Sequence, residues 1–127
     1  MPITILLVDD DAIQAATRKA ILTRFGNDVL LASDGKQALS VLGSPENSEH
    51  IDLVITDHIM PQMNGPQFVK ELRQNFPSMP VLVLSGLPDV ESEYEGLHVL
   101  FRLKPLAPEE LIRLVGSIPG DALGRTA

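Results

Sequence analysis

The sequence has no cysteine and no tryptophan, only one tyrosine, and few basic residues. Without cysteine the chain cannot form a disulfide framework, a thiolate zinc site or a cysteine nucleophile. Lysine and arginine number 10 against 17 aspartates and glutamates, so the formal net charge is −7. Phosphate contacts need a basic surface, and we therefore expect no direct binding to nucleic acid.

Long hydrophobic runs are also missing, because none approaches the roughly 20 residues that a membrane span needs. The N-terminus leads directly into a predicted strand and has no basic region like that of a signal peptide. We expect no membrane association and a cytoplasmic location. With 127 residues, of which 44% are hydrophobic, the chain predicts one compact domain over residues 1–118 and a flexible C-terminal tail over 119–127.

Five short apolar runs predict strands, and segments with helical periodicity separate most of them. The predicted strands cover residues 3–8, 29–32, 53–56, 81–84 and 99–103. The first predicted helix has its apolar stripe at Ile13, Ala16, Ala20, Ile21 and Phe25. Between the later strands, residues 43–49 predict a polar loop, and the acidic segment 89–96 predicts only a weak helix or an ordered loop. This alternation indicates an α/β fold, a doubly wound parallel sheet with helices on both faces.

Polar residues follow four of the five predicted strands. In chain order these residues are Asp9 and Asp10, Asp57, Ser85 and Lys104. The carboxyl ends of parallel strands form the ligand-binding edge of such a sheet, so we expect these side chains to converge.

Converging carboxylates require a cation, because each pair at about 4 Å costs on the order of 4 kcal/mol at an effective dielectric near 20. Mg²⁺ suits a set of carboxylate and carbonyl oxygens. The remaining acid, Asp57, could act as a nucleophile toward a phosphoryl group. Lys104 and the Ser85 hydroxyl could then bind the phosphoryl oxygens.

These residues and their spacing resemble the receiver domain of two-component response regulators, from Ile3 to Ile118. The resemblance implies a flavodoxin-like domain with a five-stranded sheet of order 2-1-3-4-5. It also implies that Asp57 is the phosphorylated aspartate and that the Lys104–Pro105 bond is cis.

The resemblance further assigns the metal site and a conformational switch. Mg²⁺ would be held by Asp10 directly, by Asp9 mostly through water, by Asp57, and by the backbone carbonyl of Ile59. Ser85 would follow the phosphoryl group, and Phe101 would turn inward behind it.

In this family the phosphoryl group comes from the phosphohistidine of a histidine kinase or of a histidine phosphotransfer protein in a phosphorelay. The implied output is signal transduction to a downstream effector protein, by a phosphoprotein that is a monomer or a weak phosphorylation-dependent dimer. The chain would assist its own phosphorylation and dephosphorylation but would not be a turnover enzyme.

Three alternatives remain open. The pattern Asp9-Asp10-Asp11 resembles a small haloacid-dehalogenase-like phosphatase with Asp9 as nucleophile, although no polar continuation or cap insertion follows. A flavodoxin is disfavoured because no phosphate loop follows the first strand and few aromatic residues could hold a flavin. A docking module without phosphorylation is the third alternative. His50, His58 and His98 lack metal-ligand spacing, and we expect them to be exposed or locally hydrogen-bonded.

Overall fold

A computed structural model describes residues 3–48 and 50–126, and its centre is a parallel sheet of five strands. The strands are β1 (Thr4–Val8), β2 (Asp28–Ala32), β3 (Leu53–Asp57), β4 (Val81–Ser85) and β5 (Leu100–Leu103). Their order is β2-β1-β3-β4-β5, and every neighbouring pair is parallel. The predicted fold class and strand order are therefore confirmed.

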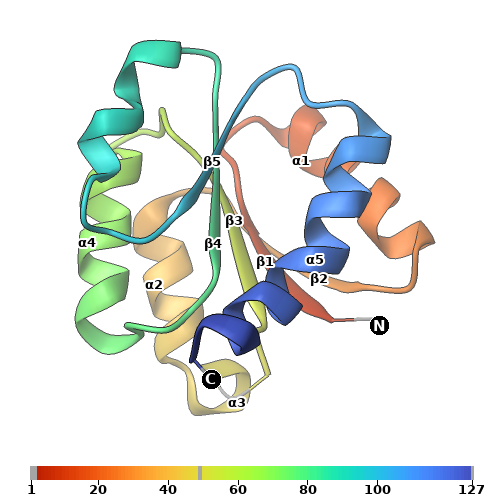
Figure 1. The fold of residues 1–127 in the computed structure, drawn as a ribbon, viewed down its shortest axis with the longest axis horizontal. Helices are drawn as coiled ribbons and strands as arrows, with labels where there is room; N and C mark the ends of the chain where they lie inside the picture. The colour runs from red at the N-terminus through yellow and green to blue at the C-terminus, as the bar shows by residue number, and fades with distance from the viewer. Residues whose placement is uncertain (1–2, 49, 127) are drawn as a thin grey trace.

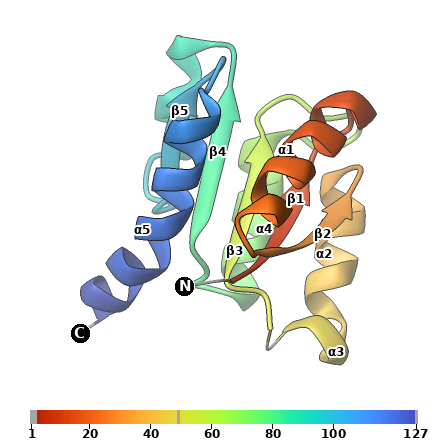
Figure 2. The same ribbon diagram turned by 90° about the vertical axis from the view of Figure 1, so that its right-hand side faces the viewer.

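Helices cover both faces of the sheet (Figure 1). They are α1 (Ala12–Arg24), α2 (Gly35–Gly43), α3 (Pro45–Ser48), α4 (Gly65–Asn75) and α5 (Pro108–Thr126), with a 3₁₀ helix, η1 (Pro88–Tyr94), between β4 and β5. Helices α1 and α5 lie on one face, and α2, α4 and η1 lie on the other, as the two perpendicular views show (Figures 1 and 2). None of the helices in the described residues is long and apolar enough to cross a membrane.

The core is divided into two clusters by the sheet. In β3, Val54 packs in the cluster under α2 and α4, whereas Ile55 packs in the cluster under α1 and α5. Side chains of a strand alternate between the two faces. The same alternation directs Asp57 toward α1 and the next residue, His58, toward α4.

Helix N-caps fix the turns at the carboxyl edge. The Asp11 carboxylate accepts hydrogen bonds from the backbone N–H groups of Ile13 and Gln14, so Asp11 caps α1. Asn64 begins α4 with a reciprocal capping box to Gln67. Such caps satisfy N–H groups that have no partner within the helix.

One local prediction differs from the structure, because the predicted polar loop over 43–49 contains the short helix α3. The acidic segment 89–96, predicted as a weak helix or an ordered loop, lies mostly within the 3₁₀ helix η1. Helix α5 extends to Thr126 and so continues beyond residue 118, where the predicted domain ends. Proline disturbs the preceding turn of a helix without always ending it.

Candidate functional site

Three aspartates meet at the carboxyl edge, where β1 and β3 lie side by side. Asp9 follows β1 and is 3% exposed, Asp57 ends β3 and is 4% exposed, and Asp10 is exposed to solvent. One carboxylate oxygen of each lies within 4.8 Å of those of the other two. The register of the two strands, which pairs Val8 with Thr56, brings the residues that follow them together.

The electrostatics of this pocket favour a positive charge. Burial raises the pKa of Asp9 to about 7, and its contact with the Asp57 carboxyl and the repulsion between the two acids add to this. The hydrogen bond from the backbone N–H of Asp11 and the positive charge of Arg18 both lower the pKa of Asp9. A buried pair of acids with an exposed third one is a set of hard oxygen donors, so these residues fit a divalent ion such as Mg²⁺.

Lys104 lies where the sequence predicts it. Its Nζ is 2.9 Å from Asp57 Oδ1 and 3.4 Å from Gln14 Oε1. Its backbone N–H donates to the Ser85 carbonyl at 2.7 Å, and the Lys104–Pro105 bond is cis. The link to Ser85 holds the β5–α5 turn against the end of β4, with the lysine beside Asp57.

Arg18 is a second cation in the pocket, and the sequence analysis missed it. Its Nη1 lies 2.8 Å from Asp9 Oδ2 and 3.4 Å from Asp57 Oδ1. The predicted apolar stripe of α1 was wrong, because Ile13 and Phe25 are 80% and 60% exposed.

The inner face of α1 instead carries Ala15 and Leu22, which are buried, with Arg18 between them. The positions i, i+3 and i+7 share a helix face. The spacing of Ala15, Arg18 and Leu22 was therefore the available signal.

Ser85 and Phe101, the predicted switch residues, are both buried. The Ser85 hydroxyl donates to the Leu87 carbonyl at 3.1 Å and accepts from the Leu87 N–H at 2.9 Å. Phe101 is only 8% exposed and packs against Tyr94, with ring centroids 6.0 Å apart. Ile59, the predicted carbonyl ligand, follows β3 with a side chain that is 67% exposed.

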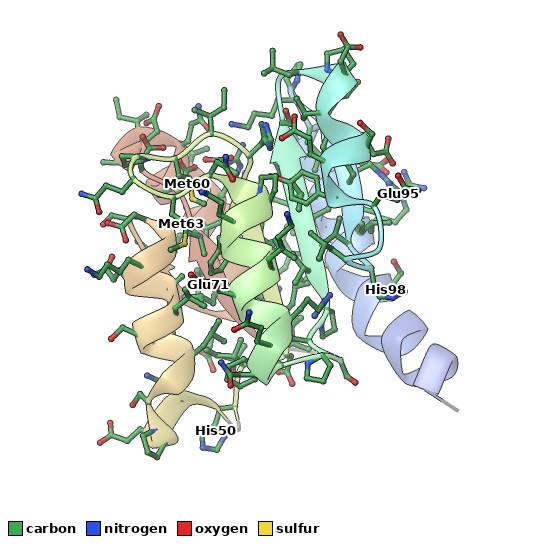
Figure 3. The ribbon with its side chains drawn as sticks, turned by 90° about the vertical axis from the view of Figure 1, so that its left-hand side faces the viewer. His50, Met60, Met63, Glu71, Glu95 and His98 are labelled. Atoms are coloured by element: carbon green, nitrogen blue, oxygen red, sulfur yellow. The ribbon has the colours of Figure 1, made fainter. Side chains whose placement is uncertain are left out.

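A second group of residues missed by the sequence analysis lies on the opposite face of the sheet. His58 is buried, and its Nδ1 is 2.7 Å from the Tyr94 hydroxyl. The expectation of an exposed or locally bonded histidine was therefore wrong for His58, whose partner is 36 residues away. His50 and His98 are exposed as expected (Figure 3).

Gly65 at the start of α4 leaves room for the Tyr94 hydroxyl. A Cβ at Gly65 would lie 1.9 Å from the Tyr94 Oη and 3.1 Å from the His58 Cα. We call His58, Gly65, Tyr94 and Phe101 the aromatic network.

The fold and the site together define a class: an open parallel α/β sheet with an acidic pocket and a lysine at its carboxyl edge. Residues 5–115 match the family model of the response regulator receiver domain, and the chain belongs to this family, whose members act in two-component signalling. The phosphatase alternative is therefore not favoured.

Similar proteins come from bacteria and plants. The chain is 32% identical over 135 residues to the response regulator MprA of Mycolicibacterium vanbaalenii, covering 100% of this chain and 57% of that protein. It is 36% identical over 117 residues to the putative two-component response regulator ARR21 of Arabidopsis thaliana, covering 90% and 18%. The chain thus spans less than two thirds of both relatives.

Solved structures agree with the fold. The signal receiver domain of an HD domain-containing protein from Pseudomonas fluorescens superposes with a TM-score of 0.85 at 26% identity, covering 98% of this chain and 99% of that one.

Proposed function

We propose that the chain accepts a phosphoryl group on Asp57 from the phosphohistidine of a histidine kinase or a histidine phosphotransfer protein. The observation that carries this proposal is the position of Asp57, a buried carboxylate at the carboxyl end of β3 whose Oδ1 lies 2.9 Å from Lys104 Nζ. A carboxylate can act as a nucleophile toward a phosphoryl group, and the lysine beside it can balance the negative charge that arrives with that group.

In the proposed reaction an Asp57 oxygen attacks phosphorus, the phosphorus–nitrogen bond breaks, and the donor imidazole leaves with the bonding electrons. Lys104 would balance charge on the transferred group, and Ser85 would donate its hydroxyl hydrogen to a phosphoryl oxygen. Asp9, Asp10, Asp57 and the carbonyl of Ile59 would hold Mg²⁺. When bound, this ion would supply further charge stabilisation to the phosphoryl oxygens.

The output would begin when Ser85 leaves its present partner. Its hydroxyl is bonded to the backbone of Leu87, so a turn toward a phosphoryl group exchanges those bonds for a charge-assisted one. Phe101 is already buried against Tyr94, which supports a repacking of the ring rather than its entry from solvent. The changed surface would be read by an effector protein, with a monomer or a weak phosphorylation-dependent dimer as the signalling form.

The test is intact mass after incubation with Mg²⁺ and acetyl phosphate. Wild type should gain one phosphoryl group, and Asp57→Asn should gain none. Asp11→Asn is a matched control because asparagine can still cap α1, and it should be labelled like wild type. Labelling of Asp57→Asn at the wild-type level, or turnover of a phosphate monoester that depends on Asp9, would reject the proposal.

A further inference from the structure

Arg18 holds an unusual position for an arginine on a helix at the surface. It lies on the inner face of α1, and its side chain is only 15% exposed. A guanidinium can be buried to this extent when it is paired with an acid and hydrogen-bonded. Here the same Nη1 lies near both Asp9 and Asp57, the two buried acids of the pocket.

The two cations of the pocket have different partners. Lys104 contacts the Asp57 carboxylate and the amide oxygen of Gln14. Arg18 has its shorter contact with Asp9, at 2.8 Å, and so lies beside the acid whose pKa is raised by burial. Both carboxylates that Arg18 contacts belong to the group of three that could hold a metal ion.

We propose that Arg18 is a built-in counter-ion that competes with Mg²⁺ for Asp9 and Asp57, and so sets the Mg²⁺ concentration at which the pocket is loaded. This inference rests on the metal-assisted phosphorylation proposed above. Carboxylate oxygens that accept hydrogen bonds from the guanidinium are less available as metal ligands. A metal ion that enters beside Arg18 is also repelled by the positive charge of the arginine. Loading with Mg²⁺ therefore requires the arginine to give up at least part of its contacts.

A metal titration tests this directly, with Arg18→Met and Lys19→Met as a matched pair. Both remove one positive charge from α1 at adjacent positions, but Lys19 is exposed. Calorimetry should show that Arg18→Met binds Mg²⁺ about tenfold more tightly than wild type. A factor of this size corresponds to the repulsion between a unit charge and a nearby divalent ion in a strongly screened site. Lys19→Met should differ from wild type by less than about twofold, because exposed charges are screened.

Thermal unfolding gives a readout that does not depend on phosphorylation. In EDTA at pH 8, Arg18→Met should have a lower Tm than wild type, because the buried Asp9 loses its counter-ion and Asp57 loses one of its two cationic partners. Mg²⁺ should raise its Tm by more than it raises that of wild type. If Arg18→Met does not fold without metal, Arg18→Gln, whose amide can still donate to Asp9, provides the same comparison.

The inference is overturned if folded Arg18→Met or Arg18→Gln binds Mg²⁺ no more tightly than wild type, or if no variant binds it. Intact mass with acetyl phosphate, measured on the same samples, separates this from the proposed function. If Asp57 is phosphorylated but wild type and the Arg18 variants bind Mg²⁺ with equal affinity, only the role of Arg18 is rejected. Tighter Mg²⁺ binding by Arg18→Met without labelling of any variant would support that role and reject the phosphoacceptor.

Discussion

Asp57 and His58 are consecutive residues, yet Asp57 lies among charged side chains and His58 lies among aromatic ones. Asp57 lies in a pocket of two buried acids, an arginine and a lysine, where burial raises the pKa of Asp9 to about 7. His58 lies in the aromatic network, where its Nδ1 is bonded to Tyr94. Within the described residues, no buried side-chain nitrogen or oxygen lacks a hydrogen-bond partner.

Because one region is held by charge and the other by packing, a change of charge in the pocket can alter the packing of the aromatic network. The pocket depends on its cations and therefore responds to added negative charge, whereas the aromatic network is closely packed and responds to small displacements. Because the two regions share the end of β3, a rearrangement at Asp57 has a short path to η1 and β5.

The largest expected effect follows from removing the lysine of the pocket. Lys104→Met deletes the charge 2.9 Å from Asp57 Oδ1. The rate of phosphorylation by acetyl phosphate should fall about a hundredfold, the typical loss for one donor to developing negative charge. Lys70→Met, which changes an exposed lysine on α4, is the control and should react like wild type. A Lys104→Met rate within threefold of wild type would refute the role of the lysine.

Overpacking the aromatic network should destabilise the protein. Gly65→Ala places a methyl group against the Tyr94 hydroxyl, and we expect a loss of about 2 kcal/mol in the free energy of unfolding. The control is Gly43→Ala, because a Cβ at Gly43 meets nothing within 4 Å. Urea unfolding measures both.

Removing the obstructing hydroxyl refines this test. The double variant Gly65→Ala/Tyr94→Phe should be more stable than the sum of the two single losses predicts, since the closest clash is gone. Strict additivity would show that the two residues do not interact.

Tyr94→Phe alone separates the two regions. It leaves the buried His58 Nδ1 without its partner, and unfolding should become easier by about 1 kcal/mol. The level of phosphorylation on Asp57 should stay within about twofold of wild type, because the pocket keeps all its charges. A severe loss of labelling in a folded Tyr94→Phe protein would show that the pocket depends on the network.

The smallest effect is a dependence of stability on alkaline pH. Burial, followed by the charge of Glu93, raises the pKa of Tyr94 above its ordinary value of 10.0. A group with a raised folded-state pKa stabilises the protein fully below its unfolded pKa, and this stability is lost as pH rises toward the folded value. Wild type should therefore lose stability above pH 10 more steeply than Tyr94→Phe, as urea unfolding at several pH values would show. Equal slopes would contradict the pKa direction.

The parts of the site that the sequence predicted depend on local patterns. Asp57 and Ser85 end short apolar runs, and parallel strands bring such ends to one edge whatever the details of packing. Arg18 was missed because the large apolar residues of α1, such as Ile13, indicate a helix face that is in fact exposed. The face that packs against the sheet carries Arg18. The bond between His58 and Tyr94 was missed because η1 has no helical stripe to orient it.

The most direct test of the central claim is hydrogen exchange after incubation with Mg²⁺ and acetyl phosphate. Phosphorylated wild type should change its exchange in peptides covering residues 88–104, with residues 28–43 unchanged, and Asp57→Asn should show no change in either segment. Stoichiometric phosphorylation of Asp57 with unaltered exchange throughout residues 88–104 would contradict it.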